Sequence, residues 1–144
     1  MILWMVKICC AVVTLVAVVF AIYRIGPWYE TRYWPVVSKM QLIRLERFGD
    51  RSAHAEFTFE KLRPCQFAGI NWFHRSTQDS FLVRVTAFPT QDIAAVTTPN
   101  RPLGLQHSGI WVVELPPEEI VDASLVLLYH KCHPFWLTTT EFYP

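Results

Sequence analysis

The residues with the best-defined chemistry lie near the C-terminus, in the run His130-Lys131-Cys132-His133-Pro134. His130, Cys132 and His133 all carry atoms that ligate zinc or copper, so a metal or redox site is one hypothesis for this run. The spacing disfavours it, because a strand would point His130 and Cys132 to one face and His133 to the other. Three ligands this close together also lack the usual spacing of zinc-binding pairs. We therefore predict no metal and no cofactor, and keep a metal or redox protein as an alternative.

Other arrangements that support catalysis are weak. A cysteine nucleophile needs a thiolate beside an orienting base, and no glycine-rich oxyanion element accompanies Cys132. Ser108 lies next to Gly109, but not within the Gly-x-Ser-x-Gly pattern of a serine nucleophile. Gly104 and Gly109 are instead predicted to be turn residues. The sequence therefore predicts a protein that is not an enzyme.

The first 26 residues are the most apolar part of the chain. Residues 8–23 (ICCAVVTLVAVVFAIY) carry no charge, and an apolar start before Lys7 extends the run over residues 2–25. Because about 20 helical residues cross the hydrocarbon core of a bilayer, we predict a transmembrane signal-anchor helix over residues 1–26. The lipid bilayer is then the first partner. A cleaved secretory signal is the alternative, with Val19-Phe20-Ala21 as a weak cleavage pattern.

A short aromatic neck over residues 27–37 is predicted to follow this helix, bracketed by Pro27 and Pro35. Amphipathic rings of this kind settle at the boundary between membrane and water. We therefore predict that four residues of the neck lie at the membrane interface: Trp28, Tyr29, Tyr33 and Trp34.

About seven short strands are predicted over residues 38–144, because apolar residues recur at every second position and turn residues separate the runs. The predicted strands cover residues 38–48, 53–62, 65–74, 80–88, 109–115, 124–132 and 136–142. Their number and spacing predict a mainly β fold, an immunoglobulin-like antiparallel β-sandwich. Trp72 is the candidate for the centre of its core.

Cys65 and Cys132 are the only cysteines in this predicted domain, and an even pair of this kind predicts one disulfide. Cys65 begins the third strand and Cys132 ends the sixth. These strands are antiparallel neighbours in such a sandwich, so the two residues are expected to meet at one edge. A disulfide needs an oxidising compartment, so we predict a cytoplasmic N-terminus and an extracytoplasmic domain. The charges on either side of the helix are nearly balanced and do not decide the topology.

The charge of the chain excludes a broad surface for nucleic acid. Lys and Arg number 13 against 12 Asp and Glu, a formal net charge of +1, and a nucleic-acid partner is not expected. Aromatic side chains offer a surface for a protein partner instead. The candidates are Trp111, Phe135 and Trp136, although Trp111 also suits the core.

Two short motifs carry a resemblance to a known group. Lys61-x-Arg63-x-Cys65-x-Phe67 and Cys132-His133-Pro134-x-Trp136-x-Thr138-Thr139, after an N-terminal span, resemble small single-span membrane proteins of tailed phages and prophages whose activity is not established. The resemblance implies exposure in the periplasm of an infected bacterium. It implies no catalytic residue.

Together these features predict a membrane-anchored, non-enzymatic interaction module on the periplasmic face of a bacterial cytoplasmic membrane, with a protein partner that the sequence does not identify. One alternative is a phage lysis factor of the holin or antiholin kind, whose span oligomerises. Ala11, Ala17 and Ala21 leave some capacity for such close helix packing.

Overall fold

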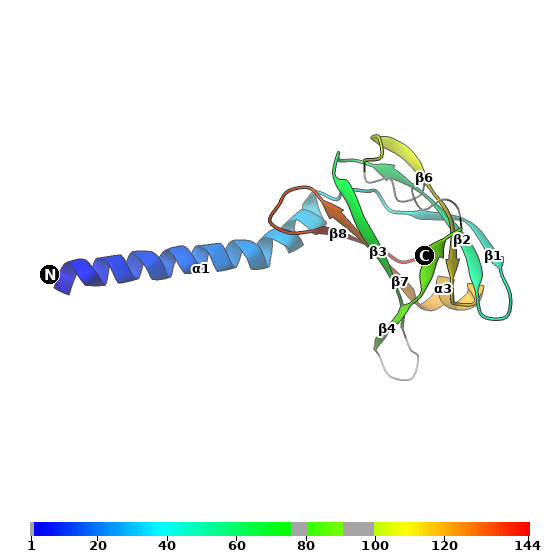
Figure 1. Ribbon diagram of the computed structural model, residues 1–144, viewed down its shortest axis with the longest axis horizontal. Helices are drawn as coiled ribbons and strands as arrows, with labels where there is room; N and C mark the ends of the chain where they lie inside the picture. The colour runs from blue at the N-terminus through cyan, green and yellow to red at the C-terminus, as the bar shows by residue number, and fades with distance from the viewer. Residues whose placement is uncertain (1, 76–80, 91–99) are drawn as a thin grey trace.

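The fold was analysed in a computed structural model that describes residues 2–75, 81–90 and 100–144. One long N-terminal helix projects from a β domain (Figure 1). The helix is α1 (Ile2–Tyr33). The β domain contains β1 (Gln41–Arg47), β2 (Ala53–Lys61), β3 (Gln66–Arg75), β4 (Leu82–Val85), β5 (Ala87–Pro89), β6 (Gly104–Val113), α3 (Pro117–Ala123), β7 (Ser124–Lys131) and β8 (Thr138–Phe142).

Helix α1 confirms the predicted long apolar helix. Its side chains over residues 3–25 are exposed, and the β domain covers only the C-terminal end of the helix. An apolar helix with no protein around it needs another apolar environment. Its length and composition suffice to cross a membrane, and a signal sequence would satisfy the same criteria.

The neck is shorter than predicted, because α1 continues through Pro27 to Tyr33. A proline inside a helix removes one backbone hydrogen bond and crowds the preceding turn, which bends the helix. Figure 1 shows the last turns of α1 directed away from the axis of the rest. The connection to β1 is residues 34–40, in which Val36 and Val37 are fully buried.

The strands form two antiparallel sheets, with the orders β1-β2-β6-β5 and β4-β3-β7-β8. In an immunoglobulin-like sandwich, the first, second, fifth and fourth strands form one sheet and the third, sixth and seventh form the other. The observed orders follow this arrangement: β1, β2, β6 and β5 take the places of the first sheet, and β3, β7 and β8 those of the second. β4 is an additional strand at the edge of the second sheet, next to β3. The prediction of a mainly β sandwich after a helix is confirmed.

One predicted strand, over residues 80–88, is two strands in different sheets. β4 pairs with β3, whereas β5 pairs with β6. The chain crosses between the sheets at Thr86, which is the only residue between them. Ser80 lies outside the described residues. The alternation of apolar residues could not show this crossing, because period two is kept on both sides of it.

β6 begins earlier than predicted and contains both glycines that were predicted to form turns. Gly104 and Gly109 have φ angles of 98° and 75°, in the region that glycine adopts without strain. Gly109 lies opposite the irregular pairing between Glu56 and Thr58, where β6 carries an extra residue. Gly109 is therefore required for a β-bulge rather than for a turn.

The core lies between the two sheets, and Trp72 is at its centre, as predicted. Trp72 is 1% exposed, and its ring lies 5.5 Å from that of Phe57 in the opposite sheet. Trp111 belongs to the same core and is 6% exposed. Of the two interpretations of Trp111, core residue is therefore right and partner surface is wrong.

Candidate functional site

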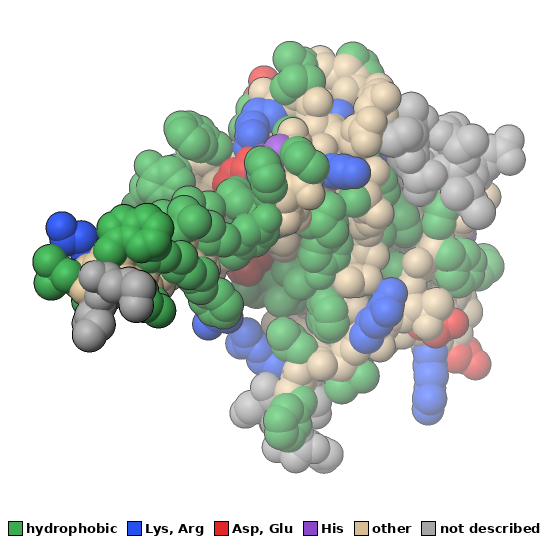
Figure 2. Space-filling view, turned by 60° about the vertical axis from the view of Figure 1, so that its left-hand side comes forward, with side chains coloured by type: hydrophobic (Ala, Val, Ile, Leu, Met, Phe, Trp, Pro, Cys, Tyr) green, Lys and Arg blue, Asp and Glu red, His purple; other side chains and the backbone are tan. Residues whose placement is uncertain are grey.

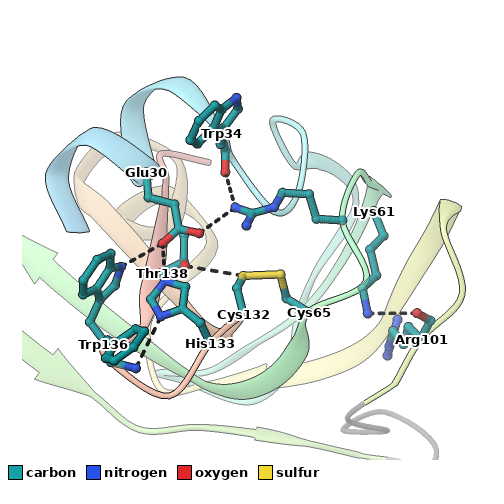
Figure 3. Close-up of a disulfide and its surroundings, with 11 residues drawn as sticks. Glu30, Trp34, Lys61, Cys65, Arg101, Cys132, His133, Trp136 and Thr138 are labelled. Carbon is teal, nitrogen blue, oxygen red and sulfur yellow. Dashed lines mark hydrogen bonds and ion pairs between the residues drawn. A yellow bond between two sulfur atoms is a disulfide. The ribbon is translucent and has the colours of Figure 1, made fainter. Parts of the chain in front are cut away.

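The predicted disulfide joins Cys65 and Cys132 (Figure 3). Gln66 at the start of β3 pairs with Lys131 at the end of β7, so the adjoining cysteines lie next to each other, with their Cα atoms 4.5 Å apart. The edge position predicted from the strand order is confirmed. Because the sulfur of Cys132 is bonded to Cys65, it is neither a thiolate ligand nor a nucleophile in this form.

The two histidines beside the disulfide have different surroundings. His130 is 4% exposed and packs its ring 5.8 Å from that of Phe67, inside the β domain. His133 lies in the loop between β7 and β8, and its Nε2 is 3.0 Å from the carboxylate of Glu30. Within residues 2–75, 81–90 and 100–144, no group of three or more His, Cys, Asp or Glu side chains is arranged to hold a metal. His130, Cys132 and His133 therefore do not form a common metal site.

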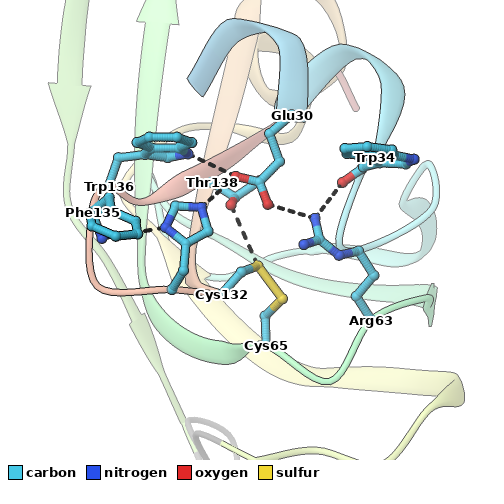
Figure 4. Close-up of polar contacts among 9 residues, drawn as sticks. Glu30, Trp34, Arg63, Cys65, Cys132, Phe135, Trp136 and Thr138 are labelled. Carbon is cyan, nitrogen blue, oxygen red and sulfur yellow. Dashed lines mark hydrogen bonds and ion pairs between the residues drawn. A yellow bond between two sulfur atoms is a disulfide. The ribbon is translucent and has the colours of Figure 1, made fainter. Parts of the chain in front are cut away.

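Glu30 is the centre of the polar contacts between α1 and the β domain (Figure 4). Its side chain is 7% exposed. Arg63 Nη1 donates to its Oε1 at 2.8 Å, and Trp136 Nε1 donates to its Oε2 at 2.8 Å. His133 contacts the same Oε2. We call the contacts of Glu30 with Arg63, His133 and Trp136 the helix junction.

The helix junction keeps Glu30 ionised. Burial by itself would raise the pKa of the carboxyl group, but the hydrogen bonds, first of all that from Arg63, outweigh burial and lower the pKa from 4.5 to about 2. Glu30 lies beyond Arg24, outside the predicted membrane-spanning residues 1–26. At neutral pH the contact with Arg63 is therefore an ion pair, in which the Glu30 side chain is buried and the Arg63 side chain is 31% exposed.

Arg63 also holds the end of α1. The same Nη1 atom donates to the carbonyl oxygen of Trp34 at 2.8 Å, and the Trp34 amide donates to the carbonyl oxygen of Glu30 at 2.9 Å. A helix end leaves carbonyl groups without helical partners, and a basic side chain satisfies them well. Arg63 thus binds both the side chain of Glu30 and the backbone where the helix ends.

Trp136 supplies the apolar part of the helix junction. A Cβ atom on Gly26 would lie 2.7 Å from the Trp136 ring, so only glycine allows this approach. The ring of Tyr23 lies 6.1 Å from that of Trp136, edge to face, and the ring of His133 lies 4.4 Å away. Trp136 was predicted to form a partner surface, but it serves a contact within the chain. Its neighbour Phe135 remains 62% exposed.

The sequence assigned no role to Glu30 or Gly26, and it singled out Arg63 only as part of a motif, without its contact with the helix. Glu30 is the only acidic residue among the first 37, which was the available signal. Nothing in the spacing connected it with Arg63 or His133, which are 33 and 103 positions away. No sequence pattern marks Gly26, because glycine is needed there only to make room for the ring of Trp136, more than a hundred positions later.

A small cavity lies between the sheets. It is lined by aliphatic and aromatic side chains together with Lys61, Ser108, Arg101 and His130. Its volume of about 40 Å³ suits one or two waters rather than an organic ligand. Lys61 Nζ donates to the carbonyl oxygen of Arg101 at 2.8 Å (Figure 3). Burial, and then the charge of Lys61, lowers the pKa of His130 to about 4, and burial also lowers the pKa of Lys61. His130 is therefore neutral at physiological pH.

The aromatic residues predicted for the membrane interface lie on and just after the last turns of α1. All four are exposed: Trp28, Tyr29, Tyr33 and Trp34. The rings of Tyr29 and Tyr33 are 4.7 Å apart, and those of Tyr29 and Trp34 are 5.8 Å apart. Their place at a membrane interface stays a prediction.

Comparison with known proteins does not indicate a function for the chain, so the proposed function is based on the structure. No family model, no curated protein and no solved structure matches the chain. The resemblance to phage membrane proteins therefore also stays a prediction.

Proposed function

We propose that the chain is a single-pass membrane protein that presents its β-sandwich as a non-enzymatic interaction module on the outer face of a bacterial cytoplasmic membrane. The helix junction at Glu30 is the observation that carries this proposal. A flexible linker would be enough to attach a domain, whereas buried polar contacts also hold it in one orientation. The phage origin is part of the proposal and depends on the two resembling motifs.

The disulfide supports the extracytoplasmic placement. Bonds of this kind form and persist in oxidising compartments, and the bacterial periplasm is one of them. Cys65 and Cys132 are both in the β domain, whereas Cys9 and Cys10 are free and lie in the apolar part of α1. With the N-terminus in the cytoplasm and the β domain in the periplasm, the bridged pair would lie in an oxidising compartment and the free pair would lie within the membrane.

The edge strand β4 is the surface that we propose for a protein partner. β3 pairs with one side of β4, and no strand among the described residues pairs with the other side. Phe81, Leu82 and Val83 are 73%, 47% and 54% exposed. An edge strand with apolar side chains accepts a further strand by backbone hydrogen bonding. We therefore propose that the partner contributes an extended, apolar segment.

Topology and anchoring can be tested together on protein from bacterial membranes. Intact cells are treated with a membrane-impermeant thiol reagent, and the purified protein is mapped by mass spectrometry without reduction. We expect a Cys65–Cys132 bridged peptide and a retained N-terminal helix. Unlabelled free thiols at both positions, or a chain that begins after Ala21, would contradict the proposal.

Photo-crosslinking tests the partner surface. A photoreactive residue replaces Val83 in the full chain, and Val121 on α3, which is 49% exposed, is the matched control. We expect a discrete product from position 83 that position 121 does not give and that Leu82→Lys reduces, because a charged edge resists pairing. Equal products from both positions would contradict the assignment to β4.

Expression also separates this proposal from the lysis-factor alternative. An interaction module leaves the membrane potential of the producing cells intact, and we expect viable cultures. Rapid loss of the membrane potential would contradict the proposal and support a lysis factor instead.

A further inference from the structure

The loop between β7 and β8 lies alongside the apolar part of α1. Figure 1 shows this loop turning back toward the helix, and Figure 2 shows apolar side chains that continue from α1 onto the adjoining face of the β domain. Phe135 and Trp136 of the loop line a groove with Val19, Ile22 and Tyr23 of the helix. The volume of this groove is about 300 Å³, and its walls are almost wholly apolar.

The length of α1 sets the depth of this loop relative to a membrane. About 20 helical residues span the roughly 30 Å hydrocarbon core. A span counted from Ile2 ends near Ile22, and one counted from Ile8, after Lys7, ends near Pro27. In both cases the groove beside Val19 and Ile22 lies at the boundary of the hydrocarbon or inside it. Phe135 lies at the same depth, because it lines that groove.

The helix junction holds the loop at this depth. Trp136 packs on Gly26 and is hydrogen-bonded to Glu30, so the loop cannot leave the helix without breaking buried contacts. The tip of the loop also has an internal partner for its backbone, since the Phe135 amide donates to His133 Nδ1 at 3.4 Å. Backbone groups that enter an apolar environment need such partners. The Phe135 ring itself is 62% exposed and makes up part of the apolar groove wall.

We infer that Phe135 inserts into the outer leaflet of the membrane, at the boundary of headgroups and acyl chains, and that lipid acyl chains occupy the groove between the loop and α1. This inference rests on the proposed anchoring of α1. It gives the β-sandwich two membrane contacts, the helix and the Phe135 loop. Two contacts restrict the tilt of the domain, whereas a single helix leaves the tilt free.

Depth-dependent fluorescence quenching tests the inference on the full chain. The protein is reconstituted into vesicles of phosphatidylethanolamine and phosphatidylglycerol that contain lipids with a quencher at a known depth. In a Cys9→Ser, Cys10→Ser background, a polarity-sensitive dye is attached at Phe135→Cys. The matched control is Phe48→Cys. Phe48 is 53% exposed and belongs to the β1–β2 turn, which lies at the end of the domain far from α1 (Figure 1). The native Cys10, labelled in a Cys9→Ser chain, reports on the helix itself.

We expect the dye at position 135 to emit at shorter wavelength than the dye at position 48, and to be quenched several-fold more strongly by shallow quenchers. Non-reducing peptide mapping of each labelled protein verifies that Cys65 and Cys132 are still bridged. Quenching at Cys10 by quenchers deep in the acyl chains, with equal and weak shallow quenching at positions 135 and 48, would overturn the inference and leave the anchor intact. Weak quenching at Cys10 by quenchers of every depth would overturn both the inference and the proposed anchoring.

Discussion

At the residue scale, Glu30 is the side chain on which the helix junction depends. A buried ion pair is of limited net value, but removal of one partner leaves the other charge without compensation. We expect Glu30→Gln to lower the free energy of opening the junction by about 3 kcal/mol, because Arg63 loses its counter-charge. Hydrogen exchange at the Trp136 indole measures this opening, since that N–H donates to Glu30.

Glu46→Gln is the matched control for this change. Glu46 is also paired with an arginine, Arg44, at 2.8 Å, but both side chains are about half exposed. Exposed ion pairs contribute little because solvent screens them. We expect no measurable change in exchange at Trp136, and an effect as large as that of Glu30→Gln would contradict the role assigned to the junction.

The pKa of Glu30 adds a pH dependence to the same contact. The pKa is lowered to about 2 in the folded protein and is 4.5 for an ordinary glutamate. The stabilisation is therefore complete above pH 4.5 and is lost as the pH falls toward 2. In the natural protein, hydrogen exchange at the Trp136 indole between pH 5 and pH 3 should show this loss of stabilisation. In Glu30→Gln, the contribution of Glu30 to this pH dependence should be absent.

His130 predicts a second loss of stability on acidification, which begins at a higher pH than the loss due to Glu30. Its pKa is lowered from 6.5 to about 4, so the unfolded chain binds the proton more readily than the folded one. Stability is complete above pH 6.5 and falls as the pH drops toward 4, by on the order of 3 kcal/mol. Denaturant unfolding at several pH values measures this slope. His130→Leu should flatten it between pH 6.5 and 4, and an unchanged slope in that variant would contradict the assignment.

At the element scale, the contact between α1 and the β7–β8 loop requires glycine at one position of the helix. Alanine at Gly26 would gain up to about 1 kcal/mol in helix propensity. It would also place a methyl group 2.7 Å from the Trp136 ring, which is closer than atoms can pack. We expect Gly26→Ala to lower the free energy of opening the junction by roughly 1–3 kcal/mol, again measured at the Trp136 indole.

Gly69 in β3 is the matched control for Gly26. No atom outside its chain neighbours lies within 4 Å of a Cβ placed there. We expect Gly69→Ala to leave exchange at Trp136 unchanged. If Gly26→Ala also left it unchanged, the close approach of Trp136 to the helix would not be what holds the loop.

The same scale shows why part of the fold could be predicted and part could not. Buried side chains alternate with more accessible ones from Ala53 to Lys61 in β2 and from Val126 to Lys131 in β7, so these strands could be predicted from the sequence. The crossing at Thr86 and the bulge at Gly109 leave no such pattern, because a change of sheet and an extra residue depend on what lies opposite. Helix α1 continues past Pro27 for a related reason: the contacts of Glu30 stabilise turns that the proline by itself would weaken.

At the scale of the whole molecule, the disulfide closes a loop that contains most of the β domain. Cys65 and Cys132 are 67 positions apart, and the chain-entropy estimate for such a loop is about 4 kcal/mol. We expect the double variant Cys65→Ser, Cys132→Ser to lower the free energy of unfolding by about this amount, measured by denaturant titration in detergent micelles.

The double variant Cys9→Ser, Cys10→Ser controls for the loss of cysteine as such. Both cysteines are free and lie on the exposed surface of α1. We expect the free energy of unfolding of the β domain to stay unchanged in this variant. A loss equal to that of the disulfide variant would show that the effect does not come from the bridge.

The sequence by itself determined the features that depend on local pattern. Apolar length predicted the long N-terminal helix, period-two alternation predicted the sandwich, and the order of the strands brought Cys65 to Cys132. Each of these follows from residues that are near in the chain or from a rule of sheet topology. No contact between distant side chains had to be known.

Only the tertiary structure decided what the polar and aromatic side chains do. It separated His130 from His133, placed Trp111 in the core, and joined Glu30 to Arg63 and to the loop that carries Trp136. These residues come together because two packed sheets and a helix end meet at one place. That meeting depends on the whole fold, so the pattern of neighbouring residues in the chain does not contain it.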